Sequence, residues 1–124
     1  MSDRIDGAMS DRIDGDRATA ELLSDLAEMI ASDRGTHGDA VEQHETAAKL
    51  WTTYLNSCGI LRDDARLSAA QVARLMALLK ISRDAEGEYS IDTDRDIAGY
   101  GGIAAACSVH QGQADEDDLA RGGE

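Results

Sequence analysis

The sequence predicts an all-α protein in which four helices form one bundle. Three observations support this prediction. The chain has 124 residues, which is the length of one domain. Aromatic residues make up only 3% of the chain, and strands prefer aromatic residues, so a core built mainly from Leu, Ile, Ala, Val and Met favours helices. Four stretches repeat their apolar residues at helical spacing, and none shows a stronger strand alternation.

The first two helices are expected at about residues 17–32 and 39–57. In the first, one apolar stripe contains Leu22, Leu26, Met29 and Ile30. The segment RGTHG at residues 34–38 interrupts the pattern. The second helix is expected to begin at Asp39, because Asp39 and Glu42 have the Asp-x-x-Glu spacing of a capping box. Trp51 and Tyr54 of this helix can stack on a base, although their helical spacing is typical of core residues.

The third and fourth helices are expected at about residues 68–85 and 93–110. Ser68 and Gln71 have the spacing of a capping box, and Gly87 is placed to end the third helix. The fourth helix contains three glycines within one turn, Gly99, Gly101 and Gly102. Each interior glycine costs a helix up to about 1 kcal/mol relative to alanine. These glycines are therefore expected to allow close approach by another helix or by a ligand.

The two ends of the chain differ from its middle. The heptapeptide MSDRIDG occurs twice, at residues 1–7 and 9–15, and the tail at residues 111–124 contains the acidic run DEDD. The tail has only one large apolar residue, Leu119. Residues 1–16 and 111–124 are therefore expected to be disordered, on either side of a helical domain at residues 17–110.

The charge of the chain excludes some partners. Its 25 acidic and 12 basic residues give a formal net charge of -13, which disfavours direct binding to nucleic acid. Such an acidic surface is typical of a salt-rich cytoplasm, and the competing interpretation is a protein that mimics the phosphate backbone of DNA. No apolar run is long enough to span a membrane, so a cytoplasmic protein is expected. Cys58 and Cys107 form no metal or redox motif and are expected to be reduced, apolar residues.

Two pairs of carboxylates are candidates for metal binding. Glu42 and Glu45 are three residues apart on the second helix, and Asp92 and Asp96 are four apart at the start of the fourth. If these helices pack together, the four carboxylates converge and offer the hard oxygen ligands that Mg²⁺ or Mn²⁺ requires. Each also has a structural alternative, because Glu42 and Asp92 can cap helices and Glu45 can pair with Lys49.

Four basic residues are candidates for binding phosphate. Lys80 and Arg83 share one face of the third helix, where they either bind a phosphate or form an ion pair with Asp92 or Asp96. Arg34 and His37 precede the second helix, whose free N–H groups favour anions.

Residues 34–55, 67–87 and 92–105 together resemble a family of small phage and prophage proteins of uncharacterised function. The strings LLKISR and DIAGY, at residues 78–83 and 96–100, are its most specific parts. That family is similar in its helical plan to the all-α MazG-like nucleotide pyrophosphohydrolases. Their Glu-Glu-x-x-Glu motif is matched here in spacing only by Glu42 and Glu45, and Asp92-x-x-x-Asp96 replaces their Glu-x-x-Asp motif. The phage family usually has Asn where this chain has Gln43.

The resemblance implies an enzyme, its cofactor and its assembly. The enzyme would convert (deoxy)nucleoside triphosphates to monophosphates and pyrophosphate, as a homodimer or homotetramer. Glu42 and Glu45 would be the catalytic residues and would hold Mg²⁺ together with Asp92 and Asp96. Lys80, Arg83, Arg34 and His37 would bind the phosphates. The alternatives are a viral protein that binds nucleotides without catalysis, for example against a host defence, and the acidic DNA mimic.

Overall fold

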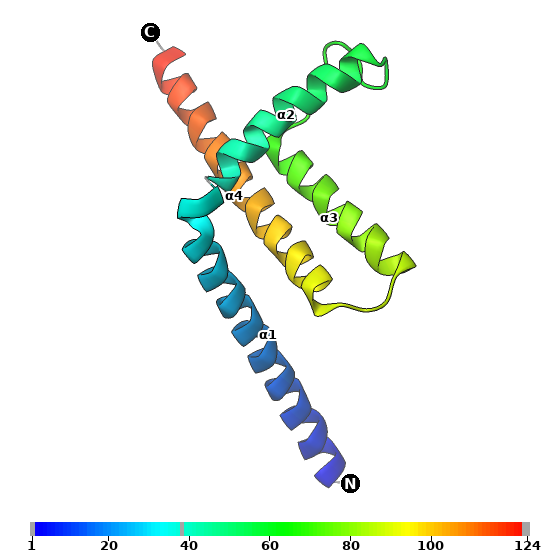
Figure 1. The fold of residues 1–124 in the computed structure, drawn as a ribbon. Coiled ribbons are helices and arrows are strands. Elements are labelled where there is room, and N and C mark those ends of the chain that lie inside the picture. The colour runs from blue at the N-terminus through cyan, green and yellow to red at the C-terminus, as the bar shows by residue number, and fades with distance from the viewer. Residues whose placement is uncertain (1, 38, 123–124) are drawn as a thin grey trace. The chain divides into compact units, whose positions relative to one another are not determined.

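The computed structural model describes the backbone of residues 2–37 and 39–122, and the side chains of residues 14–32 and 39–122. All regular structure in this part of the chain is helical: α1 (Ser2–His37), α2 (Ala40–Ser57), α3 (Ala69–Glu86) and α4 (Ile91–Gly122) (Figure 1). The prediction of an all-α protein with four helices is confirmed. Over the same residues, no helix combines the length and apolar content needed to cross a membrane.

Two helices are longer than their apolar periodicity predicts. α1 begins at Ser2 rather than at about Arg17, and α4 continues past His110 to Gly122. The extension of α4 includes a hydrogen bond in which Gln111 Nε2 donates to Asp115 Oδ1, 2.9 Å away. A helix satisfies its own backbone groups, so it can extend beyond the residues that pack in a core. A helix without tertiary contacts exchanges with coil. The expectation that residues 1–16 and 111–124 are mobile therefore stays a prediction.

The chain divides into two compact units, Met1–Thr36 and His37–Glu124. In the first unit, the apolar stripe of α1 is exposed, and Leu22, Met29 and Ile30 keep 41%, 50% and 44% of their surface accessible. The second unit contains α2, α3 and α4 and carries every predicted site residue whose side chain is described.

The predicted cap residues lie at the ends of α2 and α3, and the capping box is present in α3. Asp39 caps α2, since its Oδ1 accepts a hydrogen bond from the Val41 N–H over 2.8 Å. Ser68 and Gln71 form the capping box of α3, in which each side chain accepts a hydrogen bond from the other residue's backbone N–H. Gly87 ends α3, as predicted. These caps satisfy N–H groups that a helix leaves without intrahelical partners.

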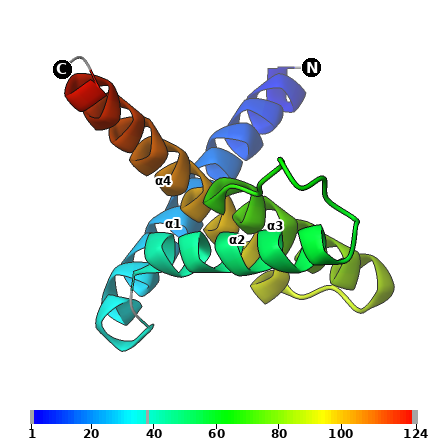
Figure 2. The same ribbon diagram turned by 90° about the horizontal axis from the view of Figure 1, so that it is seen from above.

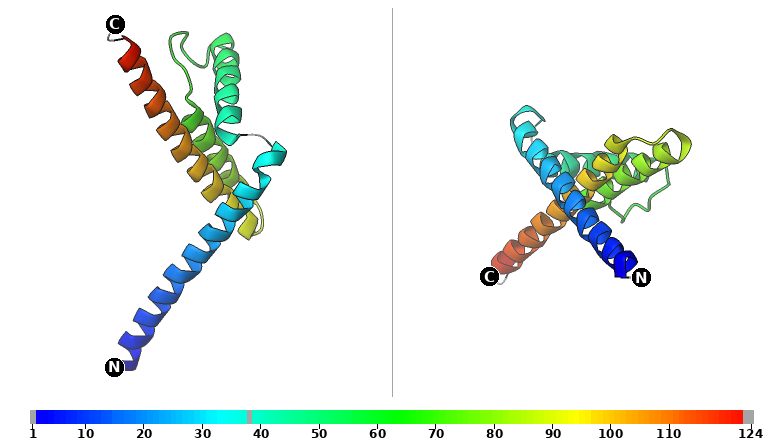
Figure 3. Two further views of the ribbon diagram at one scale, coloured as in Figure 1. Left: turned by 90° about the vertical axis from the view of Figure 1, so that its left-hand side faces the viewer. Right: turned by 90° about the horizontal axis from the view of Figure 1, so that it is seen from below.

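The core of the second unit is built from small residues. α3 and α4 run antiparallel and side by side, and α2 packs against both (Figures 1 and 2). At the centre lie Ala70 and Ala73 of α3 and Ala104 and Cys107 of α4, and Ala73 is fully buried. Small side chains permit the close approach of α3 and α4 that two further views also show (Figure 3). This core fixes which residues of α3 and α4 face each other.

The two cysteines have different environments. Cys107 is buried and Cys58 is exposed, so only Cys107 is the small core residue that the sequence predicted. Burial raises the pKa of the Cys107 thiol, and the negative charges of Glu45 and Asp39 raise it further. The thiol therefore stays protonated at neutral pH and is unreactive as a nucleophile.

The three glycines of α4 are not in close contact with another helix of this chain. A Cβ added at Gly99, Gly101 or Gly102 would meet no heavy atom of the described residues within 4 Å, leaving aside its chain neighbours and the local backbone of its own helix. Among the described residues, the expectation of close approach by another helix is therefore wrong. Gly101 and Gly102 are exposed, whereas Gly99 is half-buried.

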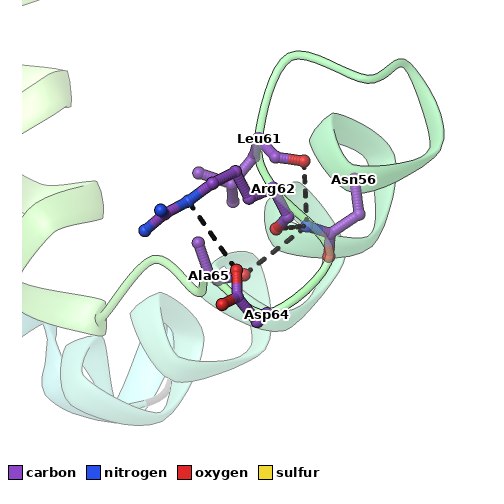
Figure 4. Close-up of polar contacts among 5 residues, drawn as sticks. All are labelled: Asn56, Leu61, Arg62, Asp64 and Ala65. Atoms are coloured by element: carbon purple, nitrogen blue, oxygen red, sulfur yellow. Dashed lines mark hydrogen bonds and ion pairs between the residues drawn. The ribbon is translucent and has the colours of Figure 1, made fainter.

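The loop between α2 and α3 is held by hydrogen bonds to the side chains of Asn56 and Thr52. Asn56 Nδ2 donates to the carbonyl oxygens of Leu61, Arg62 and Ala65 over 3.4, 2.7 and 3.5 Å (Figure 4). The loop is also anchored at its end, where the Leu67 N–H donates to Thr52 Oγ1 over 3.0 Å. These bonds fix the distance between the end of α2 and the start of α3.

Replacing Asn56 by aspartate is expected to destabilise the protein by about 1–3 kcal/mol. An ionised carboxylate has nearly the same shape but donates no hydrogen bond, so it would place a negative charge against the carbonyl oxygens. Urea unfolding of Asn56→Asp and Asn56→Ala measures the effect, with the aspartate variant the less stable. Ser57→Ala is the control, since Ser57 only donates to Thr53 in its own helix. Equal stability of all three variants would contradict this role of Asn56.

Candidate functional site

The first candidate site lies where α3 and α4 pack together. Lys80 Nζ of α3 is 3.3 Å from Asp96 Oδ2 of α4. The lysine side chain is 21% exposed and the aspartate 49%, so the ion pair lies at the edge of the packed interface. Of the alternatives that the sequence left open for Lys80, the ion pair with Asp96 is therefore formed.

Further charged residues lie beside this ion pair. On α4, Arg95 Nη1 is 3.5 Å from Oδ1 of Asp92, whose side chain is 81% exposed. Asp92 and Asp96 are one turn apart, so they lie on the same side of α4. Arg83 is in the last turn of α3 and makes no ion pair among the described residues. We call Lys80, Arg83, Asp92, Arg95 and Asp96 the seam cluster.

Arg95 was not among the residues predicted from the sequence. In the sequence, Arg95 could have been found by its spacing of three residues from Asp92, which allows an ion pair on one helix. Its presence gives the seam cluster three cations and two carboxylates in a chain whose formal net charge is -13. An anion therefore meets less repulsion here than over most of the surface.

The carboxylates of α2 lie elsewhere. Glu45 Oε1 is 2.9 Å from His110 Nδ1 on α4, rather than paired with Lys49, and Glu42 is exposed. His110 follows Asp96 by fourteen residues, which is about 21 Å along a helix at 1.5 Å per residue. The structure therefore does not bring Glu42 and Glu45 together with Asp92 and Asp96 in one chain. Among the residues that the structure describes, no group of three or more His, Cys, Asp or Glu is placed to hold a metal ion.

The two remaining predicted phosphate ligands, Arg34 and His37, have side chains outside the described residues. The two aromatic residues of α2 have separate environments: Tyr54 is 67% exposed, and Trp51 is half-buried. Trp51 lines a hollow between α2, α3 and α4 that also contains His44 and Tyr100. Sequence reasoning did not select His44 and Tyr100, because they come together only when α2 packs on α4.

The fold and the seam cluster define an all-helical protein with a mixed-charge site between two antiparallel helices. Residues 21–108 match the family described as a domain of unknown function, DUF6378, and the chain belongs to this family. Over 83 residues the chain is 40% identical to the Gene 55 protein of Mycobacterium phage L5. This match covers 66% of the chain and 49% of the phage protein, so the chain spans about half the length of that relative. No solved structure matches the chain.

These matches support the prediction of a small phage protein family of unknown function. The matched residues include α2, α3 and the part of α4 that carries the seam cluster. The repeated heptapeptide and the acidic tail both lie outside residues 21–108.

Proposed function

We propose that this protein is a MazG-like, metal-dependent nucleoside triphosphate pyrophosphohydrolase that acts on (deoxy)nucleotides in the host cytoplasm. The observation that carries the proposal is the seam cluster, in which Asp96 lies 3.3 Å from Lys80 and Asp92, one turn away on α4, lies 3.5 Å from Arg95. Carboxylates suit a metal ion, and cations suit the phosphates that this metal ion accompanies. The all-α fold is consistent with the proposed class of enzyme.

Asp92 and Asp96 fit the way in which Mg²⁺ is commonly bound. This ion often keeps several waters and binds one or two carboxylates together with substrate phosphates, so a complete cage of protein ligands is not needed. Both carboxylates are accessible, at 81% and 49% exposure. When bound there, Mg²⁺ would neutralise charge on the phosphates and generate a nucleophile from water. Lys80 and Arg83 would bind the outer phosphate oxygens and orient the chain of phosphates.

Glu42 and Glu45 take part in this proposal through a second copy of the chain. Because Glu45 lies beside His110, about 21 Å along α4 from Asp96, the two carboxylate pairs can act on one substrate only if two chains contribute. We therefore include a homodimer or homotetramer in the proposal.

The outward face of α3 is suited to such an association. A hollow on this face is lined by Leu67, Gln71, Arg74, Leu75 and Leu78. Leu75 and Leu78 keep 41% and 58% of their surface exposed, although they are large and apolar. Residues 67–81 contain no acidic side chain, so two copies of this acidic protein would meet there with little charge repulsion.

Nucleotide capture without turnover is a second candidate function. Asp92, Asp96 and Glu45 are each paired with a basic side chain in the structure. A metal ion would have to compete with these partners, whereas Arg83 makes no ion pair among the described residues and can bind a phosphate without a metal ion.

The decisive experiment is an assay of the purified protein with a panel of deoxynucleoside triphosphates and Mg²⁺ at high salt. Release of pyrophosphate and a monophosphate would support the enzyme, and nucleotide binding without release would support capture. Mixing the variants Glu45→Gln and Asp96→Asn then tests the shared site. Each variant alone is expected to lose most of its activity, and mixed oligomers are expected to recover part of it. No recovery on mixing would contradict a site built from two chains.

The assembly is expected to depend on salt. Below about 0.1 M salt, carboxylates within about 10 Å of each other repel without effective screening, so the oligomer should loosen. Light scattering and circular dichroism across a salt series measure its mass and helicity, and both are expected to fall at low salt. A monomer whose mass and helicity are the same at all salt concentrations would contradict both the oligomer and this account of its acidity.

A further inference from the structure

A hollow between α2, α3 and α4 has the lining of a site for a flat ring. Its volume is about 210 Å³ and it is open to solvent. The lining residues are Gln43, His44, Ala47, Trp51, Val72, Met76 and Tyr100. The His44 and Tyr100 rings contact each other edge to face, with centroids 6.1 Å apart and planes inclined by 62°. Aromatic and thioether side chains of this kind offer a polarisable surface to a planar ligand.

We propose that this hollow is a nucleobase site, an inference that rests on the proposed function and extends it to the other end of the nucleotide. The hollow is chiefly apolar, and stacking of a base on an aromatic side chain is favourable for any base. A planar heteroaromatic ring is thus the class of ligand that this lining fits. The phosphates of the same ligand would then need cations nearby.

The hollow and the seam cluster follow one another along the same two helices. Met76 of α3 and Tyr100 of α4 line the hollow. Lys80 follows Met76 by four residues and Asp96 precedes Tyr100 by four, and because α3 and α4 are antiparallel, both steps lead to the same ion pair. Four residues of helix span about 6 Å. This is the kind of separation that a pentose bridges between base and phosphate, so one nucleotide can occupy both places.

His44 supplies a polar group with a defined role. Its Nδ1 lies 2.8 Å from the Ala40 carbonyl oxygen, which can only accept a hydrogen bond, so Nδ1 carries the hydrogen. In the neutral ring, Nε2 is then an acceptor. Every natural base presents N–H donors at its edge, and His44 would accept one of them.

The single tryptophan of the chain makes the proposal testable by fluorescence, because Trp51 lines the hollow. The probes are the deoxynucleosides, the α,β-imido deoxynucleoside triphosphates with Mg²⁺, which resist cleavage, and inorganic tripolyphosphate with Mg²⁺. Deoxynucleosides and the nucleotide analogues are expected to quench Trp51 to saturation. Tripolyphosphate is expected to compete with the nucleotide analogues without quenching. Free N-acetyltryptophanamide corrects for light absorbed by the bases.

Filling the hollow is the matched test. Ala47→Leu places extra bulk in the lining and is expected to raise the Kd of the nucleotide analogue by about tenfold or more, a loss of about 1.4 kcal/mol. The affinity for tripolyphosphate is expected to stay within twofold. Thr46→Leu is the control, because Thr46 is the exposed neighbour of Ala47 and does not line the hollow. Tyr100→Leu is the second variant if Ala47→Leu fails to fold by circular dichroism.

The outcomes separate this inference from the enzyme proposal. Saturable quenching by deoxynucleosides that Ala47→Leu weakens, without release of pyrophosphate, would support the base site and overturn the enzyme. Release of pyrophosphate with no quenching, and with equal KM for Ala47→Leu and the wild type, would overturn the base site and leave the enzyme proposal standing.

Discussion

Replacing Asp96 by asparagine is expected to lower the rate of pyrophosphate release by about 100-fold, a loss of about 2.7 kcal/mol of transition-state stabilisation. The substitution removes a negatively charged oxygen ligand at nearly constant volume. It therefore acts on metal binding rather than on packing. Calorimetric titration with Mn²⁺ is expected to show weaker binding than for the wild type. Glu42→Gln, an exposed position on α2, is the companion variant and is expected to lower activity in the same assay.

The same substitution is expected to have little effect on stability. Loss of a charge from a buried ion pair costs about 3–5 kcal/mol, but the Asp96 side chain is 49% exposed, so its partner Lys80 can be solvated. We expect a loss of about 1 kcal/mol or less in thermal melts. Asp94→Asn is the control, because Asp94 is exposed on the same helix and makes no ion pair in the structure. Full activity of Asp96→Asn would contradict the metal site, and absence of divalent-metal binding by the wild type would overturn the enzyme.

Replacing Ala104 by leucine is expected to destabilise the second unit by about 1–3 kcal/mol. Ala104 is 4% exposed and packs in the core with Ala70 and Ala73, where α3 and α4 approach closely. A larger side chain would force the helices apart or adopt a strained rotamer. For a unit of this size, each kcal/mol lowers the melting temperature by about 4–8 °C.

The neighbouring residue provides the control for this prediction. Ala105 is exposed on the same turn of α4, so Ala105→Leu is expected to change stability by less than about 0.5 kcal/mol. Both variants add the same side chain to the same helix, and only their burial differs. Similar melting temperatures for the two would contradict the assignment of Ala104 to the core.

Much of the secondary structure could be predicted from the sequence because its causes are local. Asp39 and Ser68 cap helices through hydrogen bonds that span two or three residues, and Gly87 ends α3. The apolar period of α3 predicted the helix but not which of its residues are buried, since Val72 is 1% exposed whereas Leu75 and Leu79 keep 41% and 48% of their surface accessible.

The extensions of α1 and α4 were not predicted. Ile5, Met9 and Ile13 do follow one another at helical spacing in the first, whereas the second has only one large apolar residue past Gln111, Leu119, and so offers little periodic signal.

The candidate site was predicted only in part, because its residues belong to different helices. The sequence identified Lys80, Asp92 and Asp96 by their type and spacing. It left open whether Lys80 pairs with Asp96, and it suggested Lys49 rather than His110 as the partner of Glu45. Spacing within one helix determines which side chains share a face, and this is fixed by the backbone geometry of that helix.

The register between helices was decided by the tertiary structure alone. Packing of Ala73 against the α4 core residues places Lys80 opposite Asp96 and brings Met76 and Tyr100 to one hollow. The same packing places Glu45 beside His110, far along α4 from Asp96. Such contacts depend on which faces of two helices meet and on their relative position along the helix axes. That arrangement is the one that minimises the free energy of the whole packed core. The sequence by itself therefore determined the helices, their caps and the kinds of charged side chain, whereas the tertiary structure decided which of them act together.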